Sequence, residues 1–399
     1  MKIAIVGGGA AGLMAAVVAC QKHNVTVFEK QNRVGKKLFA SGNGKCNVTN
    51  SILTRQNLSK PNDFYNCQRA NDVVSAFDYD DFMSFCKNTL ALETIVDSQG
   101  RVYPRSEQSG SVLDAFRLRC QKNGVKICDN TDVYRIEKTA KGFKLHFGQE
   151  QTAYFDKVVF CVGSSAQTRN FNSFDLLKDF KINLIKRQAS LTPVKTQKVW
   201  LPLNGVKTKC NVTLYQNGQR VMSENGEVLF RDYGLSGIVI FNVSAYIARN
   251  IAKGVDAKYY VSLDLFNEIT QKQLEEKLFE RFAVCGNESK TFFVGLLCNK
   301  LAEEVIKNCK LAEIIKKEDI SKIAKFLKNI RFDVSGLCGE DKGQVVSGGI
   351  DFAETDENLQ CKKVPGLYFA GECLDADGLC GGFNLHFAFA SGYLAGKSL

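Results

Sequence analysis

The N-terminal stretch of the chain alternates between apolar runs of two different lengths. Ile3–Val6 is a short apolar run, Ala10–Cys20 is an alanine-rich apolar stretch of helical length, and Val25–Phe28 is again short and apolar. Runs of strand length on both sides of a stretch of helix length are typical of a β-α-β unit, in which a helix joins two parallel strands. The pattern therefore predicts that the chain begins with such a unit.

Helical spacing of apolar residues returns further along, and strand-like alternation follows it. We predict helices over Val73–Asn88 and Val112–Lys122. Predicted strands follow at Val125–Ile127, Val133–Ile136, Phe143–Phe147 and Lys157–Val162. The last of these strands is apolar at consecutive positions, which is typical of a parallel strand that is covered on both faces.

The pattern changes from about Leu191 to Leu263, where short strands are separated by turn signals. One such signal is Asn217-Gly218, a pair typical of a two-residue β-hairpin. Lysine-rich segments with the spacing of amphipathic helices follow at Leu274–Phe282, Ser289–Lys307, Lys310–Lys316 and Ser321–Ile330. A strand over Leu367–Ala370 and an apolar helix over Leu385–Leu394 are predicted near the end of the chain.

These elements predict an α/β fold in which both ends of the chain build one domain. A chain of 399 residues exceeds the size of one typical domain. We expect a discontinuous Rossmann-like domain over residues 1–190 and 345–399. An inserted β unit is expected over residues 191–265 with 331–344, and a helical subdomain over residues 266–330.

Composition is that of an ordinary globular protein. Hydrophobic residues make up 45% of the chain and charged residues 24%, and there are only five prolines. The fifteen cysteines form no CxxC pair, which is expected of reduced thiols and offers no metal-binding spacing. There is no signal-peptide pattern and no apolar run of about 18 residues. We therefore expect a cytoplasmic protein without a membrane span, as a monomer or a weak homo-oligomer.

The formal net charge of +11 is unevenly distributed. Between Lys30 and Asn62 there are seven basic residues and no acidic residue. Such a segment indicates either an anionic partner or a solvated surface, and both interpretations stay open. A second basic run, between Lys307 and Arg331, is interleaved with acidic residues, and we interpret it as a solvated surface.

Glycines at a fixed spacing follow the first predicted strand. Gly7, Gly9 and Gly12 fit the GxGxxG pattern of dinucleotide-binding folds. The first permits a tight turn, the second lets the backbone approach a pyrophosphate, and the third lets the helix pack closely on the sheet. Glu29 ends the second strand, 22 residues after Gly7, where a carboxylate accepts hydrogen bonds from an adenosine ribose. The motif predicts a dinucleotide site but does not distinguish FAD from NAD.

A segment near the C-terminus favours FAD. Gly366–Glu372 ends in Ala-Gly-Glu and resembles the second FAD fingerprint of the glutathione reductase and fumarate reductase superfamily, in which the acidic residue holds the ribityl chain. Gly381–Asn384 then opens the last helix, whose free N–H groups can face the flavin ring. No second GxGxxG occurs between a strand and a helix, so NAD(P)H would bind only transiently, as the electron donor.

The residues that we expect to bind FAD come from both ends of the chain. They are Gly7, Gly9, Ala10, Ala11, Gly12, Glu29, Lys30, Lys37, Ser41, Gly42, Asn43, Cys46, Asn47, Gly163, Gly371, Glu372, Gly381, Gly382, Phe383 and Asn384.

The motifs also match one family along nearly the whole chain. The matching blocks, in order, are Gly35–Leu38, Ser41–Asn50, Gly100–Ser106, Gly234–Gly237 and Gly366–Gly396. The chain resembles the BaiN-type flavoproteins, also labelled aminoacetone-oxidase-type NAD(P)/FAD-dependent oxidoreductases. This resemblance implies an FAD domain of the glutathione/fumarate reductase type, with an inserted β-barrel-like unit and a helical unit. It also implies reduction of polarised C=C bonds, with branches that act on bile acids and on uridine in large-subunit ribosomal RNA.

Three places depart from the family pattern. Gly163-Ser164-Ser165 replaces a glycine-rich extension, and Arg231-Asp232-Tyr233 stands where a Thr-His pair is common. His386 occupies a place that glutamine often holds. Substrate specificity can therefore differ from that of other members.

Reduction of a conjugated C=C bond needs a hydride and then a proton from an acid. Three side chains are candidates for that acid. Cys46 lies in a glycine-rich loop beside basic residues, where a thiol can be activated, and Cys380 precedes the last helix. His386 lies one turn into that helix. For all three, a structural role is the alternative.

Four basic residues are candidates for substrate binding. Arg101 and Arg105 can grip phosphate or carbonyl oxygens, or can form ion pairs that hold their loop. Lys36 and Lys45 can contact the FAD pyrophosphate, an RNA backbone or only water.

Three functions fit these features. The first is an FAD-dependent, NAD(P)H-linked reductase that converts uridine to dihydrouridine in large-subunit ribosomal RNA. The second is a small-molecule enone reductase or amine-type oxidase. The third is a flavin redox sensor or an RNA-binding scaffold without enzymatic activity.

Overall fold

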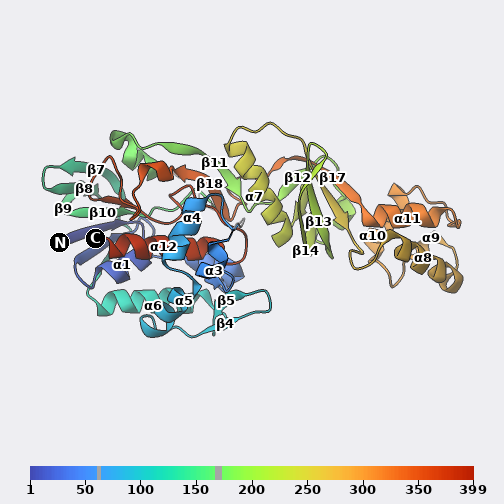
Figure 1. Cartoon of the computed structure of the whole chain (residues 1–399), viewed down its shortest axis with the longest axis horizontal. Helices are drawn as coiled ribbons and strands as arrows, with labels where there is room; N and C mark the ends of the chain where they lie inside the picture. The colour runs from blue at the N-terminus through green and yellow to red at the C-terminus, as the bar shows by residue number, and fades with distance from the viewer. Residues whose placement is uncertain (61–63, 167–172) are drawn as a thin grey trace. The chain divides into compact units, whose positions relative to one another are not determined.

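The computed structural model describes residues 1–60, 64–166 and 173–399 as two compact units. One unit comprises Met1–Gln188 and Gln344–Leu399, and the other comprises Ala189–Gly343 (Figure 1). In the described residues, no helix is long and apolar enough to cross a membrane.

The first unit is built on a parallel five-stranded sheet. Its strand order is β19 (Leu367–Phe369), β10 (Lys157–Phe160), β1 (Lys2–Val6), β2 (Asn24–Phe28) and β6 (Lys126–Cys128). Ile5 of the central strand lies opposite Val159 on one side and Val27 on the other. The predicted β-α-β unit is confirmed, because helix α1 (Ala10–Ala19) joins the parallel strands β1 and β2.

Helix α12 (Phe383–Lys397) packs closely along α1 (Figure 1). A Cβ atom at Gly392 would lie 2.3 Å from the Ala11 carbonyl oxygen, and one at Gly396 would lie 2.9 Å from the Ala15 carbonyl oxygen. These glycines are four residues apart and therefore lie on one face of α12. Their missing side chains let the last helix approach the first, and this contact joins the two ends of the chain.

Smaller elements complete the first unit. Its other helices are α2 (Lys36–Ala40), α3 (Arg55–Leu58), α4 (Gln68–Ala76), α5 (Tyr79–Asn88) and α6 (Ser109–Lys122). Its antiparallel strands are β3 (Thr49–Asn50), β4 (Thr94–Val96) and β5 (Arg101–Pro104) in one sheet, and β7 (Val133–Thr139), β8 (Gly142–Phe147) and β9 (Gln151–Phe155) in another. Strand β11 (Leu184–Ser190) pairs with β18 (Val345–Ile350), and short 3₁₀ turns span Ser41–Gly44, Ser173–Phe180 and Phe352–Glu354.

The single helix predicted over Val73–Asn88 is wrong, because the chain forms two helices there. Phe77 leaves the helical conformation, and Asp78 accepts a hydrogen bond from the backbone N–H of Asp81. This side chain acts as an N-cap, which starts a new helix.

The second unit contains a closed antiparallel barrel. Its strands, in order around the barrel, are β12 (Val194–Thr196), β15 (Gly234–Ser236), β14 (Gln219–Arg231), β13 (Lys207–Gln216), β16 (Tyr259–Asp264) and β17 (Ile330–Leu337). The predicted hairpin is confirmed, since Asn217 and Gly218 both have positive φ angles between β13 and β14. These two strands have 10 and 13 residues, so the expectation of only short strands here is wrong.

Helix α7 (Ile238–Ala252) was not predicted, because the sequence pattern of this region indicated only strands. Its sequence is rich in β-branched residues, which by themselves favour strands. Val239, Val243 and Ile247 are buried, and they follow the helical spacing. Packing against the barrel strand β14 therefore stabilises a helix that local preference does not indicate.

A group of helices extends the second unit. These are α8 (Gln271–Cys285), α9 (Ser289–Phe292), α10 (Asn299–Asn308) and α11 (Asp319–Lys328). The predicted helix over Ser289–Lys307 is interrupted between α9 and α10. The predicted helix over Lys310–Lys316 is wrong. The backbone there bonds across to another segment, since Ser289 N–H donates to the Glu313 carbonyl and Ile315 N–H donates to the Asn287 carbonyl.

Candidate functional site

The glycines in the turn between β1 and α1 differ in whether the surrounding protein leaves room for a side chain. A Cβ atom at Gly7, where φ is +104°, would lie 2.4 Å from the Cys161 carbonyl oxygen, and one at Gly12 would lie 2.0 Å from the Gly7 carbonyl oxygen. The packing of the protein itself therefore requires these two glycines. A Cβ atom at Gly9 would meet no atom within 4 Å. Gly9 lies at the N-terminus of α1 beside open space, where backbone N–H groups can receive an anionic ligand.

Glu29 lies at the end of β2 beside this turn. Its carboxylate accepts hydrogen bonds from Gly8 N–H at 2.9 Å and Gln31 N–H at 2.8 Å, and burial raises its pKa. A cavity at the carboxyl ends of the parallel strands is lined by Gly7, Phe28, Glu29, Lys30 and Val162, among others. The carboxyl end of a parallel sheet is where α/β folds bind nucleotides. A cavity with a carboxylate at its wall fits an adenosine ribose.

Glu372 follows β19 and lies near α1, because a Cβ atom at the preceding Gly371 would lie 2.7 Å from the Ala11 Cβ atom. Its Oε2 atom lies 3.0 Å from the Lys37 ammonium, which also donates to the Ser164 hydroxyl and carbonyl at 3.4 Å. Its Oε1 atom is buried and accepts no hydrogen bond within the described residues. A buried acceptor without a donor is costly. The hydroxyls of a ribityl chain would supply such a donor, so the residues present fit FAD.

The glycine pair before α12 is packed against the segment that ends in β3. A Cβ atom at Gly382, where φ is +99°, would lie 2.3 Å from the Thr49 carbonyl oxygen and 2.9 Å from Asn47 Oδ1. Asn50 Nδ2 donates to the Gly381 carbonyl at 3.1 Å. Asn47 Oδ1 is buried and lacks a donor among the described residues. The structure thus brings Asn47, Gly381 and Gly382 together beside the N-terminus of α12.

The side chains of Phe383 and Asn384 serve the loop itself. Asn384 Nδ2 donates to the carbonyls of Gly378 and Leu379, and its Oδ1 accepts from Gly378 N–H at 2.8 Å. The Phe383 ring packs against Tyr65, whose hydroxyl donates to the Phe383 carbonyl. Any contact of these two residues with a flavin therefore involves their backbone.

Ser41, Gly42 and Asn43 form a 3₁₀ turn with left-handed backbone at Gly42 and Asn43. The Ser41 hydroxyl donates to the Leu38 carbonyl at 2.7 Å. Gly163 has a φ angle of +75°, and a Cβ atom there would lie 3.8 Å from the Lys37 ammonium and 4.0 Å from Glu372 Oε2. Gly163 is thus close to the ion pair of Lys37 with Glu372.

Of the two roles open for Cys46, the structure favours a structural one over an activated thiol. Cys46 is fully buried, and burial raises its pKa to about 11. A buried thiol without a cationic partner stays protonated at neutral pH and is a weak nucleophile. Cys380 is partly exposed, with its Sγ atom 3.8 Å from Gln344 Oε1, so it stays accessible beside Gly381.

His386 is buried inside the first unit, and both of its ring nitrogens have partners. Nε2 donates to the Phe77 carbonyl at 2.9 Å, and Nδ1 therefore accepts from the Thr49 hydroxyl at 2.7 Å. Burial lowers its pKa to about 4. A neutral, enclosed imidazole that links α12 to β3 is a structural group, and we omit it from the proposed catalytic residues.

This arrangement predicts a pH-dependent contribution to stability. Between pH 6.5 and about 4, the unfolded chain binds a proton at His386 that the folded chain does not bind, so stability falls as the pH falls through this window. The loss is about 2 kcal/mol at pH 5. Replacement by glutamine, which does not titrate, is expected to make the midpoint of urea unfolding less sensitive to pH between 7 and 5. Parallel curves for wild type and His386→Gln would contradict the assignment.

The basic segment between Lys30 and Asn62 is less unbalanced than its sequence indicates. Lys45 pairs with Glu107 at 2.9 Å, Lys37 pairs with Glu372, and Arg55 pairs with Asp78 and Asp81. Lys36 is exposed and donates to the Gln31 side chain at 3.1 Å. Carboxylates from distant parts of the sequence therefore neutralise much of this charge.

Arg101 and Arg105 have different environments. Arg101 Nε donates to Asp97 Oδ2 at 2.8 Å, and its backbone N–H donates to Asp97 Oδ1 at 3.0 Å, so this residue holds its own turn. Arg105 is exposed, and no described residue pairs with its guanidinium. Arg105 is the arginine of this pair whose side chain is available to an anion.

The sequence interpretation missed Tyr103. It lies on the same face of β5 as Arg101, because the two are separated by one residue. A Cβ atom at Gly381 would lie 3.8 Å from Arg101 Cγ, which brings this face close to the glycines that precede α12. Burial raises the pKa of Tyr103, so its half-buried hydroxyl carries a proton at neutral pH. Its place in the Gly100–Ser106 block was the available signal.

Comparison with known proteins gives matches along the whole chain. A family model described as the HI0933-like protein Rossmann domain matches residues 1–398. The chain is similar to a 3-dehydro-bile acid delta(4,6)-reductase of Clostridium scindens, with 29% identity over 100% of this chain and 98% of the relative. It is also similar to ribosomal RNA dihydrouridine synthases of Haemophilus influenzae and Escherichia coli, with 27% and 26% identity over 99% of this chain and 97% of each relative.

Two solved structures share the fold at low sequence identity. An open conformation of a flavocytochrome c3 fumarate reductase matches with a TM-score of 0.50 at 14% identity, over 99% of this chain and 77% of that chain. A 3-ketosteroid delta1-dehydrogenase from Sterolibacterium denitrificans matches with a TM-score of 0.51 at 12% identity, over 99% of this chain and 98% of that chain. The predicted α/β fold of the fumarate reductase type is confirmed.

Proposed function

Because this chain belongs to the HI0933-like family of FAD-dependent oxidoreductases, we propose that it reduces uridine to dihydrouridine in large-subunit ribosomal RNA. The observation that carries the proposal is full-length similarity to two proteins that bear the name ribosomal RNA dihydrouridine synthase. The chain's net charge of +11 favours a polyanionic substrate over a steroid acid.

The proposed reaction is reduction of a conjugated C=C bond, because the substrates in the relatives' names share such a bond. A 3-dehydro steroid with double bonds beside the carbonyl and a uracil ring both contain a C=C bond conjugated to C=O. When bound, reduced FAD supplies a hydride to the β-carbon of such a system. The residues of the chain have to hold the substrate, polarise its carbonyl and provide a proton at the α-carbon.

We propose that both ends of the chain hold the FAD. Gly9 and the N-terminus of α1 bind the pyrophosphate, Glu29 binds the adenosine ribose, and Glu372 binds the ribityl chain. The backbone of Gly381–Asn384 faces the redox-active ring, and NAD(P)H is the transient electron donor. The orphaned carboxylate oxygen of Glu372 supports this assignment.

We propose that Tyr103 donates the proton and that Arg105 binds an anion of the substrate. Tyr103 on β5 is half-buried and protonated, and Arg105, the residue that follows β5, has an unpaired guanidinium. Cys380 remains an alternative donor because it is partly exposed beside the same glycines.

Mapping of dihydrouridine tests the substrate. Large-subunit ribosomal RNA from a strain that lacks this protein is expected to lose dihydrouridine at one or more positions. Purified holoenzyme with NADPH or NADH is expected to restore it in that RNA. Because counterion release drives binding to RNA, affinity is expected to fall by at least tenfold between 50 and 200 mM salt. Unchanged dihydrouridine in the deletion strain would contradict the proposal.

The second candidate is a small-molecule enone reductase. The 29% identity with the bile acid reductase favours it. It predicts rapid reoxidation of the reduced protein by a soluble 3-oxo-4-ene steroid, with an unchanged dihydrouridine pattern in the deletion strain. A flavin redox sensor or RNA-binding scaffold instead predicts no turnover with either nicotinamide.

A further inference from the structure

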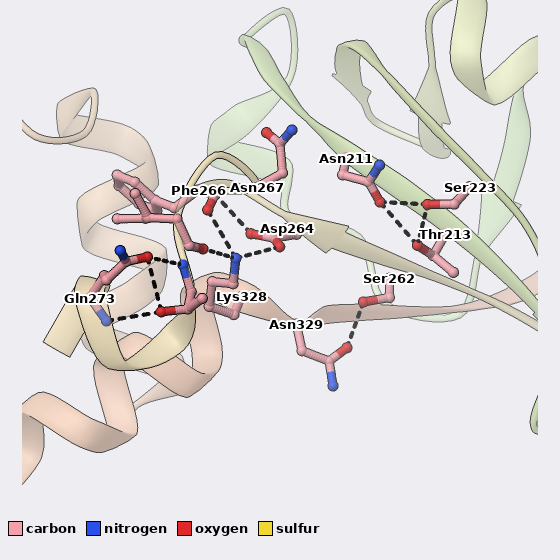
Figure 2. A network of polar contacts seen from close by, with 12 residues as sticks. Asn211, Thr213, Ser223, Ser262, Asp264, Phe266, Asn267, Gln273, Lys328 and Asn329 are labelled. Atoms are coloured by element: carbon pink, nitrogen blue, oxygen red, sulfur yellow. Dashed lines mark hydrogen bonds and ion pairs between the residues drawn. The ribbon is translucent and has the colours of Figure 1, made fainter.

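A polar groove lies within the second unit, where the outer face of the barrel meets helix α11. Val212, Leu214, Val261 and Leu263 of β13 and β16 are buried in the barrel interior. Side chains alternate along a strand, so the intervening residues face outward. The groove is lined by the outward residues Asn211, Thr213, Tyr215, Ser262 and Asp264 and, from the helices and their ends, by Gln271, Lys325, Lys328 and Asn329. Figure 2 shows Asn211, Thr213, Ser262, Asp264, Lys328 and Asn329 of this lining.

Hydrogen bonds hold the polar side chains of the groove in place. Asn211 Oδ1 accepts from Ser223 at 2.7 Å and from Thr213 at 3.1 Å, and Ser262 donates to Asn329 Oδ1 at 2.5 Å (Figure 2). The amides and hydroxyls of the wall are therefore fixed in position before a ligand arrives. Such preorganisation lowers the entropic cost of binding.

The charge of the groove is positive. The only carboxylate in its lining, Asp264, pairs with Lys328 at 2.7 Å, and Lys328 also donates to the carbonyls of Phe266 and Ile269. Lys325 is exposed, and no described residue pairs with its ammonium. Arg220, which lies opposite Tyr215 on β14, is also exposed and has no partner among the described residues. The lining thus offers one unpaired cation, Lys325, and no unpaired carboxylate, and Arg220 lies beside its residue Tyr215.

A stack of flat side chains includes Tyr215, one of the lining residues of the groove. The rings of Tyr215 and Tyr260 are parallel within 8°, with centroids 4.6 Å apart. The Arg331 guanidinium lies 3.9 Å from the centroid of Tyr260, and Asp333 holds it by hydrogen bonds of 2.9 and 2.5 Å. Because Tyr215 also lines the groove, an aromatic ring in a fixed orientation forms part of its wall.

We propose that this groove binds single-stranded RNA, with a backbone phosphate at Lys325 and a base stacked at Tyr215. The inference rests on the proposed function and names the surface by which the second unit holds the RNA substrate. Unpaired cations beside aromatic rings are the combination that proteins use to bind single strands. The amides and hydroxyls between them match the donors and acceptors of bases and riboses. An acidic peptide would use the lysine and arginine but not the stack.

The test measures binding of the FAD-loaded full chain to a fluorescein-labelled 20-mer of uridine by fluorescence anisotropy at 50 mM salt. The double variant Tyr215→Ala/Lys325→Glu is expected to bind at least tenfold more weakly than wild type. Tyr215→Phe, which keeps the ring, is expected to bind within twofold of wild type. Lys317→Glu makes the same charge change on an exposed lysine outside the groove and serves as the matched control.

Three further readouts separate the possible failures. FAD content and NAD(P)H-driven reduction of a dye acceptor are expected to be equal in all variants. If the double variant does not fold, exposed Lys325→Glu alone is expected to weaken binding at least threefold relative to Lys317→Glu. The groove assignment would be overturned if Lys325→Glu and Lys317→Glu weakened RNA binding equally. It would also be overturned if polyglutamate competed with the labelled RNA as effectively as unlabelled RNA does. If the groove assignment failed but the wild-type protein formed dihydrouridine, the proposed function would still stand. If the wild-type protein formed no dihydrouridine, the proposed function itself would be overturned.

Discussion

The Gly9→Ala variant is expected to fold normally and to lose FAD. The backbone of Gly9 has φ −79° and ψ −167°, which alanine adopts without strain, and its Cβ atom would meet no protein atom within 4 Å. In the proposed complex, that space holds the pyrophosphate at the N-terminus of α1. An added methyl group would displace the phosphates from the helix N–H groups, and we expect FAD affinity to fall by about 1,000-fold, or roughly 4 kcal/mol.

The measurement is FAD titration of the apoprotein, followed by flavin fluorescence, with thermal unfolding of the apoprotein as the check on folding. Gly110→Ala is the matched control. Gly110 lies in helix α6, and a Cβ atom there would make an ordinary contact of 3.7 Å with the side chain of Phe39. Gly12→Ala is expected to behave differently and to destabilise the apoprotein, because its Cβ atom would lie 2.0 Å from the Gly7 carbonyl oxygen. Normal FAD affinity in Gly9→Ala would refute the pyrophosphate position.

The Tyr103→Phe variant is expected to bind FAD and to accept electrons from NAD(P)H normally, but to form product about 1,000-fold more slowly. Removal of a general acid typically costs 100- to 10,000-fold in rate, roughly 3 to 5 kcal/mol. The phenylalanine ring keeps the packing of β5 and removes only the hydroxyl. In the proposed mechanism, the proton passes from the phenol oxygen to the α-carbon of the substrate, and solvent returns it.

Stopped-flow kinetics separates the two half-reactions of this variant. The rate of flavin reduction is measured without substrate, and the rate of flavin reoxidation is measured with ribosomal RNA from the deletion strain. Cys380→Ala is the control, since that thiol is the alternative donor beside the same glycines. Loss of reoxidation in Cys380→Ala, with normal reoxidation in Tyr103→Phe, would assign the proton to the thiol.

The sequence alone predicted the features that depend on adjacent residues. The β-α-β unit, the turn at Gly7 and the carboxylate of Glu29 all lie within 29 consecutive residues, and backbone geometry determines their contacts. Glu372 was singled out differently, because the Ala-Gly-Glu at the end of its strand resembles a known FAD fingerprint, and its role stays a prediction. The hairpin at Asn217-Gly218 also follows from a two-residue preference.

Long-range packing determined the properties that the sequence interpretation missed. Burial raised the pKa of the Cys46 thiol and lowered that of His386, although both had been candidate acids. Likewise, α7 is helical in spite of a strand-like sequence, because one of its faces packs on the barrel.

The fold class and the family were accessible from the sequence, which also indicated one segment near each end of the chain that we propose to hold FAD. Contacts between distant parts of the chain determine which charges remain available, since Lys45 pairs with Glu107, and Lys37 pairs with Glu372, which lies 335 residues further along the chain. The tertiary structure also placed Arg101 near Gly381 and Tyr103 within electrostatic range of Cys380, and assembled the groove from two strands and two helices. Local conformation depends on neighbours in the chain, whereas desolvation and Coulomb energy depend on distances in space.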